Sequence, residues 1–439
     1  MVSKMRWMRS CVVVILTMFC VLLGMAGPAD AVDEKMLERM EQLIKQQQAQ
    51  IEAQAKALEK LQQQVESLSE SAVKEATEAA KAEVAKTAVP SGVVSPKSDK
   101  VKVQIYGQIN QAFLTADDGD SSDYYVVDND NSSSRMGIIA TAKATEDVTV
   151  GGKIEYEIQS NASNQVDQDN KSGQGADGGG DAFNDRHIDA WVEHETFGKF
   201  SIGKGSTASD GTSEVDLSGT DVVGYASIAD MAGGILFYDD GTDALSGTNV
   251  GSVFSDFDGL GRDDRMRYDT PQIFGFTLSG SVLSGDGGDV ALRYAAQWGD
   301  FKFAAAAAYA NNGDNNSWDD QFNGSASVLH SSGLNLTLSG GQRNLDTSGR
   351  DDPTFYYAKV GYRHQFFDFG ESRFSVDYGR NDDLAQDNDE AKTWGIQIVQ
   401  DFPEWSSEYY IGYRWHELDR DLTDYDDINA LMTGVRVKF

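Results

Sequence analysis

The sequence is poor in cysteine, in proline and in positive charge. Its 439 residues include two cysteines and six prolines, with 37 Lys and Arg residues against 70 Asp and Glu residues. The formal net charge of -33 argues against nucleic acid as a partner. Both cysteines, Cys11 and Cys20, lie near the N-terminus in a segment that we expect to be removed on export. The mature chain then has no thiol, which excludes a domain held together by disulfides.

An export signal is predicted at the N-terminus. Three cations precede an apolar run over residues 11–26, and the sequence Ala29-Asp30-Ala31 follows it. This order is typical of a secretory signal peptide, here residues 1–31. An uncleaved membrane anchor is the alternative, because the run approaches the length needed to span a bilayer. A lipid anchor on Cys20 is disfavoured, because Met and Phe precede it instead of small residues.

The end of the chain alternates between apolar and polar side chains. From Leu431 to Phe439 the odd-numbered residues are Leu, Thr, Val, Val and Phe, and the residues between them include Arg436 and Lys438. A period of two indicates a strand. Cations that alternate with apolar side chains suit a wall between lipid and water, as in a membrane β-barrel. A soluble antiparallel sandwich also alternates, but it would place few charges on its inner face.

The same alternation recurs over residues 101–439 and predicts an all-β transmembrane barrel of 16 antiparallel strands. Short connectors alternate with longer polar ones, which is typical of outer-membrane barrels. The predicted strands cover residues 101–115, 134–145, 148–161, 184–196, 198–205, 263–270, 274–284, 289–298, 301–311, 321–330, 334–345, 354–366, 372–382, 391–402, 406–418 and 428–439.

Prolines and aromatic residues agree with this assignment. The six prolines fall in the signal, in a linker or in connectors, so none interrupts the hydrogen bonding of a strand. Aromatic residues gather at the short-turn ends, among them Phe197, Trp298, Phe369, Trp405 and Phe439. They are typical of the aromatic belt at a membrane interface.

A heptad pattern precedes the barrel and predicts an α-helical coiled coil over residues 32–73. Its a positions are Leu37, Ile44, Ile51, Leu58 and Val65. Three helices in the coiled coil would match a trimeric barrel, and each would extend into the periplasm. The coiled coil serves either assembly alone or also a tether to the peptidoglycan of the cell wall. Residues 74–100 are predicted as an Ala- and Lys-rich helix followed by a linker of Pro, Ser and Gly.

Short motifs of the predicted barrel resemble those of the Gram-negative general diffusion porins. They are Val103-Gln104-Ile105-Tyr106-Gly107, Ser134-Arg135-Met136-Gly137, Phe197-Gly198-Lys199-Phe200-Ser201-Ile202-Gly203-Lys204 and Arg265-Met266-Arg267-Tyr268-Asp269-Thr270-Pro271, with Phe439 as the terminal assembly signal. They follow the family's order over residues 101–439. The resemblance implies a homotrimer in the outer membrane, in contact with lipid and lipopolysaccharide. Each subunit would hold a water-filled pore for passive diffusion of small hydrophilic solutes and ions.

The resemblance also implies a constriction. In this family the loop after the fifth strand, here about residues 206–262, folds into the barrel, and its carboxylates face arginines on the wall. The arginines that match are Arg135, Arg186, Arg265 and Arg267, and the loop carries Asp210, Glu214, Asp216, Asp221, Asp230, Asp239 and Asp240. A transverse field between the two sides would favour small hydrophilic solutes over apolar ones.

Arg186 lies in the least regular predicted strand, residues 184–196. It shares parity with Ile188 and Val192, whereas His187 and Asp189 share the other side. We expect this part of the wall to face a sister subunit, because polar residues on the outer face are tolerated there better than in lipid.

Other functions stay open as alternatives. An outer-membrane hydrolase is disfavoured, because the five histidines are scattered without a nucleophile motif, and no enzyme activity is predicted. A channel specific for sugars or for an anion, and a structural tether between membrane and cell wall, are further candidates. The acidic run with Asp117, Asp118 and Asp120 lacks the full spacing of a calcium loop. A solvated loop is therefore favoured over a calcium site, and no cofactor is expected.

Overall fold

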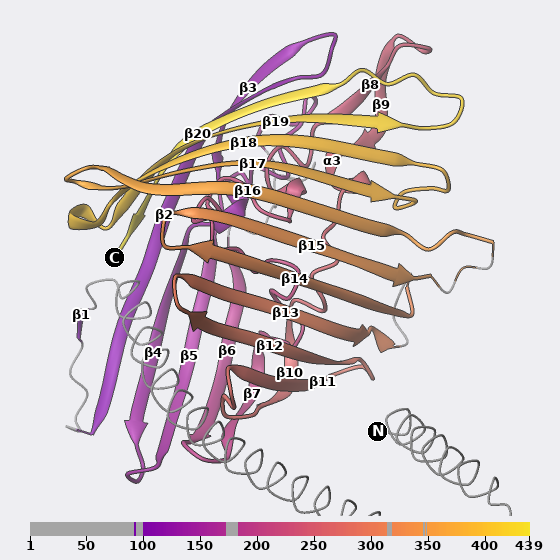
Figure 1. Ribbon diagram of the computed structural model, residues 1–439. Helices are drawn as coiled ribbons and strands as arrows, with labels where there is room; N and C mark the ends of the chain where they lie inside the picture. Colours follow the sequence, from indigo (N-terminus) through magenta and orange to yellow (C-terminus); the bar gives the residue numbers. More distant parts are fainter. Residues whose placement is uncertain (1–91, 94–99, 173–182, 314–317, 346, 348) are drawn as a thin grey trace, which may run out of the picture. The chain divides into compact units, whose positions relative to one another are not determined.

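The computed structural model describes residues 92–93, 100–172, 183–313, 318–345, 347 and 349–439. The predicted signal peptide, the predicted coiled coil with Leu37, Ile44, Ile51, Leu58 and Val65, and most of the linker lie outside these residues. Within them, no helix is long and apolar enough to cross a membrane. The described chain is nearly all β, and its strands form one barrel (Figure 1).

Sixteen antiparallel strands form a closed wall. Each pairs with the next along the wall, and the last pairs with the first, from Gln108 opposite Lys438 to Asp117 opposite Asn429. The predicted barrel of 16 strands is therefore confirmed. The wall strands are β2 (Val101–Asp117), β4 (Arg135–Lys143), β5 (Val148–Ile158), β6 (Phe183–His194), β7 (Gly198–Ser206), β10 (Arg262–Asp269), β11 (Phe276–Leu283), β12 (Gly288–Trp298), β13 (Phe301–Asn311), β14 (Asp320–His330), β15 (Leu334–Asn344), β16 (Thr354–Phe367), β17 (Gly370–Asp382), β18 (Glu390–Phe402), β19 (Ser407–Asp419) and β20 (Ile428–Lys438).

The sequence does not predict four further strands. β3 (Ser122–Asp128) doubles back along the second half of β2 before β4 begins. β8 (Leu236–Asp239) and β9 (Ala244–Asn249) form a separate hairpin in the long loop between β7 and β10. β1 (Gly92–Val93) pairs with β2 beside the end of β20. Short helical turns complete the described elements: η1 (Asp130–Ser132), η2 (Ile228–Asp230), α3 (Val250–Val253) and η4 (Pro403–Trp405).

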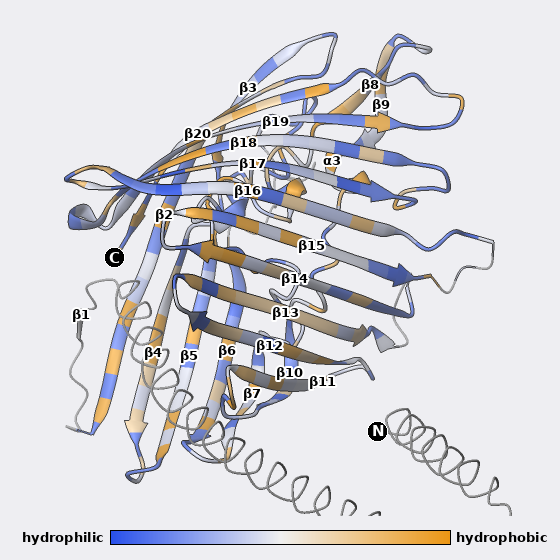
Figure 2. Ribbon diagram, in the orientation of Figure 1, coloured by the Kyte–Doolittle hydropathy of each residue, from blue (hydrophilic) through white to orange (hydrophobic). Residues whose placement is uncertain are grey.

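Side chains alternate between the two faces of the wall. On β15, Leu336 and Leu338 are exposed, whereas Thr337 and Ser339 are buried. Hydrophobic and hydrophilic residues accordingly follow one another along the strands (Figure 2). Apolar side chains cover the outside and polar side chains line the inside, which is the arrangement of a barrel in lipid rather than of a soluble sandwich.

The end of the chain closes the seam between β20 and β2. The Phe439 N–H donates to the Gly107 carbonyl at 3.0 Å, and the Gly107 N–H donates to the Phe439 carbonyl at 2.9 Å. The Phe439 ring lies over Gly107, where a Cβ atom would come within 2.6 Å of the ring. Only glycine allows this close approach, so the two residues form one closure contact.

Candidate functional site

A long loop, residues 207–261, joins β7 to β10, and much of it lies inside the barrel (Figure 1). Inward-facing side chains hold its first residues. The Asp289 carboxylate accepts hydrogen bonds from the backbone N–H groups of Ala208 at 3.2 Å and Ser209 at 2.7 Å. A carboxylate beside the turn of the β11–β12 hairpin thus holds the start of the loop inside the barrel.

Serines on the neighbouring wall hold the next segment of the loop. The hydroxyl oxygens of Ser325 and Ser327 accept hydrogen bonds from the N–H groups of Val215 at 2.9 Å and Leu217 at 3.0 Å. Short polar side chains let the loop backbone lie close to the wall while its N–H groups stay bonded. The loop therefore follows the inner surface of β14.

A buried ion pair fixes the middle of the loop. The Lys359 Nζ atom on β16 lies 2.7 Å from the Asp216 carboxylate and donates to the Gly224 carbonyl at 2.5 Å. Both charged side chains are almost excluded from solvent. Asp216, which the sequence analysis places among the constriction carboxylates, is therefore neutralised by the wall on which the loop lies.

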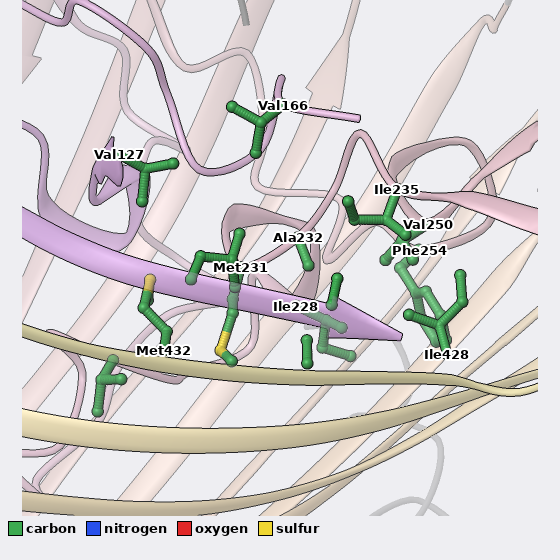
Figure 3. Packing of buried hydrophobic residues seen from close by; sticks show 14 of the residues in the cluster. Val127, Val166, Ile228, Met231, Ala232, Ile235, Val250, Phe254, Ile428 and Met432 are labelled. Carbon is green, nitrogen blue, oxygen red and sulfur yellow. The ribbon is translucent and has the colours of Figure 1, made fainter. Parts of the chain in front are cut away.

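The returning half of the loop fills part of the interior with apolar side chains. Ile228, Met231, Ile235, Val250 and Phe254 belong to one buried cluster (Figure 3). Its members from the wall and the other connections include Val127, Val166, Ile428 and Met432. Burial of so much apolar surface makes this half of the loop a packed part of the barrel.

The hairpin β8–β9 carries the loop to the end of the barrel that bears the longer connections, here called the outer mouth. The Asp240 N–H donates to the Asp424 carbonyl, and the Asp426 N–H donates to the Tyr238 carbonyl, both at 3.0 Å. The hairpin thus pairs with the connection between β19 and β20. The loop therefore contains additional residues, those of β8 and β9, that attach it to the outer mouth.

A β-bulge turns Arg186 into the barrel. The pairing of β5 with β6 slips by one residue after Glu155, which leaves Arg186 without a partner in the ladder. Strict alternation alone would place Arg186 on the outer face with Ile188, but the bulge turns it inward. Its guanidinium lies instead 2.9 Å from Glu155 and 3.0 Å from Glu157 on the inner face.

Arg135, Arg186 and Arg262 form a group that we call the arginine wall. The charges of Arg135 and Arg186 lie close enough to repel each other, and Arg262 acts on Arg135 in the same way. Arg262 lies 3.6 Å from Asp210 of the loop, and Asp210 also attracts Arg186. Asp210 is therefore the loop carboxylate that faces this wall. Arg262 was not singled out from the sequence, where it marks only the end of the loop.

Arg265 and Arg267 lie at the root of the loop. Arg265 is buried and bound to Asp189 at 2.7 Å. Arg267 is bound to Asp269 at 2.7 Å and donates to the Thr207 carbonyl at 2.6 Å. Arg265 is thus engaged by the wall strands, whereas Arg267 also holds Thr207, the first residue of the loop. Neither belongs to the arginine wall.

The remaining loop carboxylates predicted for the constriction, Glu214, Asp221 and Asp230, lie in three different surroundings. Glu214 lies with Asp256 and Asp258, and one oxygen of each falls within 4.8 Å of the others. Asp230 accepts hydrogen bonds from side chains of the loop itself. Asp221 is exposed and lines a cavity of about 1390 Å³ at the short-turn end of the barrel. Asp256 and Asp258 were not singled out from the sequence, because nothing in a loop so rich in Asp marks which carboxylates meet.

Burial and mutual repulsion disfavour the charged forms of this group. Burial, with repulsion from Asp258 and Asp256, raises the pKa of Glu214 well above its usual range. Burial raises the pKa of Asp256 to about 6. Burial, with repulsion from Asp256 and Asp210, raises the pKa of Asp258 to about 7. The charge of the group therefore changes near neutral pH.

The acidic turn between β2 and β3 uses its carboxylates locally. Asp118 accepts hydrogen bonds from the N–H groups of Ser121 at 2.7 Å and Asp120 at 3.2 Å, and Asp117 accepts one from the N–H of Gly119 at 3.2 Å. These bonds are those of a self-capped turn. The expectation that the protein needs no metal or other cofactor stays a prediction.

Comparison with known proteins gives a family match. A family model described as Gram-negative porin matches residues 74–419. Similar solved structures include a loop L8 deletion mutant of OmpT, an outer membrane protein of Vibrio cholerae, with 16% identity, a TM-score of 0.51 and coverage of 78% of this chain and 100% of that chain. The anion-selective porin from Comamonas acidovorans has 14% identity, a TM-score of 0.52 and coverage of 77% and 100%. Salmonella typhi OmpF in complex with daunomycin has 14% identity, a TM-score of 0.51 and coverage of 79% and 100%.

At these identities the solved structures are similar to this chain in fold. No curated protein sequence matches the chain.

Proposed function

The chain belongs to the Gram-negative porin family, and we propose that the loop 207–261 and the arginine wall form the constriction of its pore. The protein is an outer-membrane channel through which small solutes diffuse. Diffusion through a water-filled pore needs neither a catalytic group nor a cofactor, so the proposal includes no reaction.

One observation carries the proposal: a loop held along its length lies inside a closed barrel. Asp289 holds its start, Lys359 holds its middle, and the hairpin β8–β9 attaches it to the outer mouth. Moving the loop out of the interior would break a buried ion pair, which is costly. Solutes are therefore left with the path between Asp210 and the arginine wall.

We also propose a homotrimer in which the outer face of β6 and β7 meets a sister subunit. Asp185 and Lys204 form an ion pair at 3.1 Å on this face, beside the exposed Ile188 and Ile202. Charged side chains are costly against lipid, so protein is the more favourable neighbour for this pair. The coiled coil predicted for residues 32–73 supports the same assembly.

The rest of the proposal concerns parts outside the described residues. After removal of residues 1–31, the coiled coil of residues 32–73 lies in the periplasm, where it helps assembly or also contacts peptidoglycan. Deletion of residues 33–73 should then leave conduction intact and weaken assembly only. The mass of the deletion variant in mild detergent and its conductance in a planar bilayer test this separation.

A thiol-modification experiment tests the constriction. Because the mature chain has no cysteine, Asp210→Cys would carry a single thiol, and so would the control Asp351→Cys in the connection between β15 and β16. A bulky, charged thiol reagent should reduce the bilayer current of Asp210→Cys and leave that of Asp351→Cys unchanged. Complete modification of Asp210→Cys, verified by mass spectrometry, without a loss of current would place the path elsewhere.

A further inference from the structure

One histidine of the wall is buried without a hydrogen-bond partner. His416 on β19 is fully excluded from solvent, and neither of its ring nitrogens has a hydrogen-bond partner among the described residues. A neutral imidazole carries one donor and one acceptor, and leaving both unpaired in the interior is costly. An apolar side chain would fill the same space without this cost, so packing alone does not account for a histidine at this position.

The His416 ring faces the returning half of the loop. Its centre lies 5.4 Å from the centre of the Phe254 ring. Its register partners on the neighbouring strands are Thr393 and Ile428, and the Thr393 hydroxyl already donates to the Trp415 carbonyl at 2.9 Å. Phe254 and Ile428 belong to the buried apolar cluster (Figure 3). The ring therefore lies between a neutral part of the wall and the apolar side of the loop.

A proton on this ring would have no counterion. Among the described residues, Arg414 is the one charged group that acts on His416, and its positive charge disfavours a second one on the ring. The nearest carboxylate partner of Arg414 is Asp377, which it binds at 3.0 Å, so this carboxylate is already engaged. A protonated His416 would be a buried cation without a partner, which is strongly unfavourable.

The two halves of the loop are held to the wall in different ways. The first half is fixed by the ion pair between Lys359 and Asp216 at 2.7 Å. The returning half is held by the apolar packing around Phe254 and by neutral hydrogen bonds, such as the one from the Asn381 side chain to the Ser255 carbonyl at 2.7 Å. Attachment of the returning half therefore depends on a wall that stays neutral, and His416 is the titratable group at that contact.

We propose that His416 is an acid-sensitive switch, in which one proton on the ring releases residues 228–235 and 250–254 of the loop from the wall. While the loop is attached the ring is sealed and neutral, whereas after release it meets the water of the lumen. An imidazole in water binds a proton below about pH 6.5, so each further pH unit favours the released state about tenfold. The switch itself does not require the proposed constriction; its effect on the current rests on the proposed function.

Thiol labelling measures the release directly, because the mature chain has no cysteine. Val253 lies in the apolar cluster and is 1% exposed, whereas Asp351 is exposed in the connection between β15 and β16. Val253→Cys is labelled when the returning half is released, and Asp351→Cys reports how reactive an exposed thiol is at each pH. A pyridyl disulfide, which reacts also in weak acid, is applied to the folded protein from about pH 7 to about pH 4. The ratio of the two rates follows the released fraction.

His416→Leu, made in both cysteine variants, isolates the contribution of the ring. Carboxyls of the loop titrate with and without the histidine, so the difference between the two backgrounds reports His416 alone. From about pH 6 to about pH 4 the rate ratio with the histidine should rise over that with H416L by roughly tenfold per pH unit. The same pH dependence in both backgrounds overturns the inference. Where H416L fails to fold, H416Q, which also binds no proton, replaces it, and an unchanged pH dependence there overturns the inference as well.

Bilayer recordings separate this inference from the proposed function. A released half of the loop moves within the lumen, so the single-channel current should fluctuate more at about pH 4 than at about pH 7, and H416L should remove most of this increase. Labelling that depends on His416 without any change in the current supports the switch and overturns the proposed constriction. Labelling that does not depend on His416 overturns the switch and leaves the porin function intact.

Discussion

Lys359 and Asp216 are paired inside the barrel, with 2.7 Å between the Nζ atom and the carboxylate and with both side chains almost fully buried. The pair joins a wall strand to a loop 143 residues away in the sequence. A buried ion pair adds little net stability, but its geometry is specific, because either charge alone in the interior is very unfavourable. The pair therefore determines where the loop lies.

Replacing Asp216 with Asn should loosen the loop. The change leaves the Lys359 ammonium buried without its carboxylate, and the loss of one partner of a buried pair costs about 3–5 kcal/mol. Removing both charges, with Asp216→Asn and Lys359→Met, should recover most of this free energy. Denaturant unfolding in detergent measures the stability, and single-channel current noise measures the loop. Equal stability of the single and double variants would show that the pair does not hold the loop.

Replacing Arg186 with Ala should raise the conductance and shift the selectivity towards cations. The change removes a bulky side chain and leaves Glu155 and Glu157 without their partner. The K⁺ to Cl⁻ permeability ratio should rise by roughly two- to fourfold. Arg350→Ala removes the same side chain from a connection at the outer mouth and serves as the control. A shift towards anions would place Arg186 outside the path of the ions.

The wall could be predicted from the sequence because a barrel strand obeys a local rule. One face meets lipid and the other meets water, so alternation of the kind seen from Leu431 to Phe439 recurs along the wall. The hairpin strand β3 escaped prediction because it lies among polar residues of a connection. Alternation alone does not place Arg186 on the inner face, because a β-bulge leaves no mark in the alternation itself.

The constriction could be predicted only in part, because its contacts join residues far apart in the sequence. The bounds of the loop follow from the strands on either side, but the pairing of Asp216 with Lys359 has no sequence signal. Motif matching grouped Arg267 with Arg135, since a motif gives a position on a strand and not the partner of the side chain. In the structure Arg267 holds the root of the loop.

The selectivity of the channel should shift towards cations as the pH rises. The pKa of Asp256 is raised to about 6 and that of Asp258 to about 7, chiefly by burial, from an ordinary value of 3.8. Between the ordinary value of 3.8 and the raised values the folded protein binds more protons than the unfolded chain. The stability contributed by these carboxyls is therefore present at low pH and is lost as the pH rises through 6 to 7. Over the same window the loop gains negative charge.

Reversal potentials measured from about pH 5 to about pH 8 test this titration. The K⁺ to Cl⁻ permeability ratio should increase across the window in the wild-type channel, and D256N/D258N should show a much smaller increase. A ratio that rises equally in both channels would assign the titration to other carboxylates.

Replacing Gly107 with Val should impair closure of the barrel. A Cβ atom there would come within 2.6 Å of the Phe439 ring and 2.7 Å of the Arg135 carbonyl oxygen. Overpacking of this kind costs about 1–3 kcal/mol, so the fraction of protein that folds into the heat-modifiable form should fall. Gly280→Val is the control, because the nearest atom to a Cβ there lies at 3.7 Å. Equal folded fractions on gel electrophoresis would contradict a role of this contact in closure.

Shortening the hairpin β8–β9 should widen the outer mouth without changing the constriction. Tyr238 and Leu245 are register partners, so residues 239–244 can be replaced by Asn-Gly as a two-residue turn. The variant loses the bond between Asp240 and Asp424 and keeps the contacts of the loop middle with Lys359. At about 1 M salt, where screening acts within about 3 Å, conductance should rise and the permeability ratio should stay the same.

The hairpin variant also removes three carboxylates, so charge and width need to be separated. In low salt the gain in conductance should be smaller, because a less acidic mouth concentrates fewer cations. Replacing Asp239, Asp240 and Asp243 with Asn in the full-length hairpin is the control for charge. This control should lower the conductance in low salt and leave it unchanged at high salt, since the mouth keeps its width. Unchanged conductance of the shortened variant at high salt would show that the hairpin lies beside the path of the ions and does not narrow it.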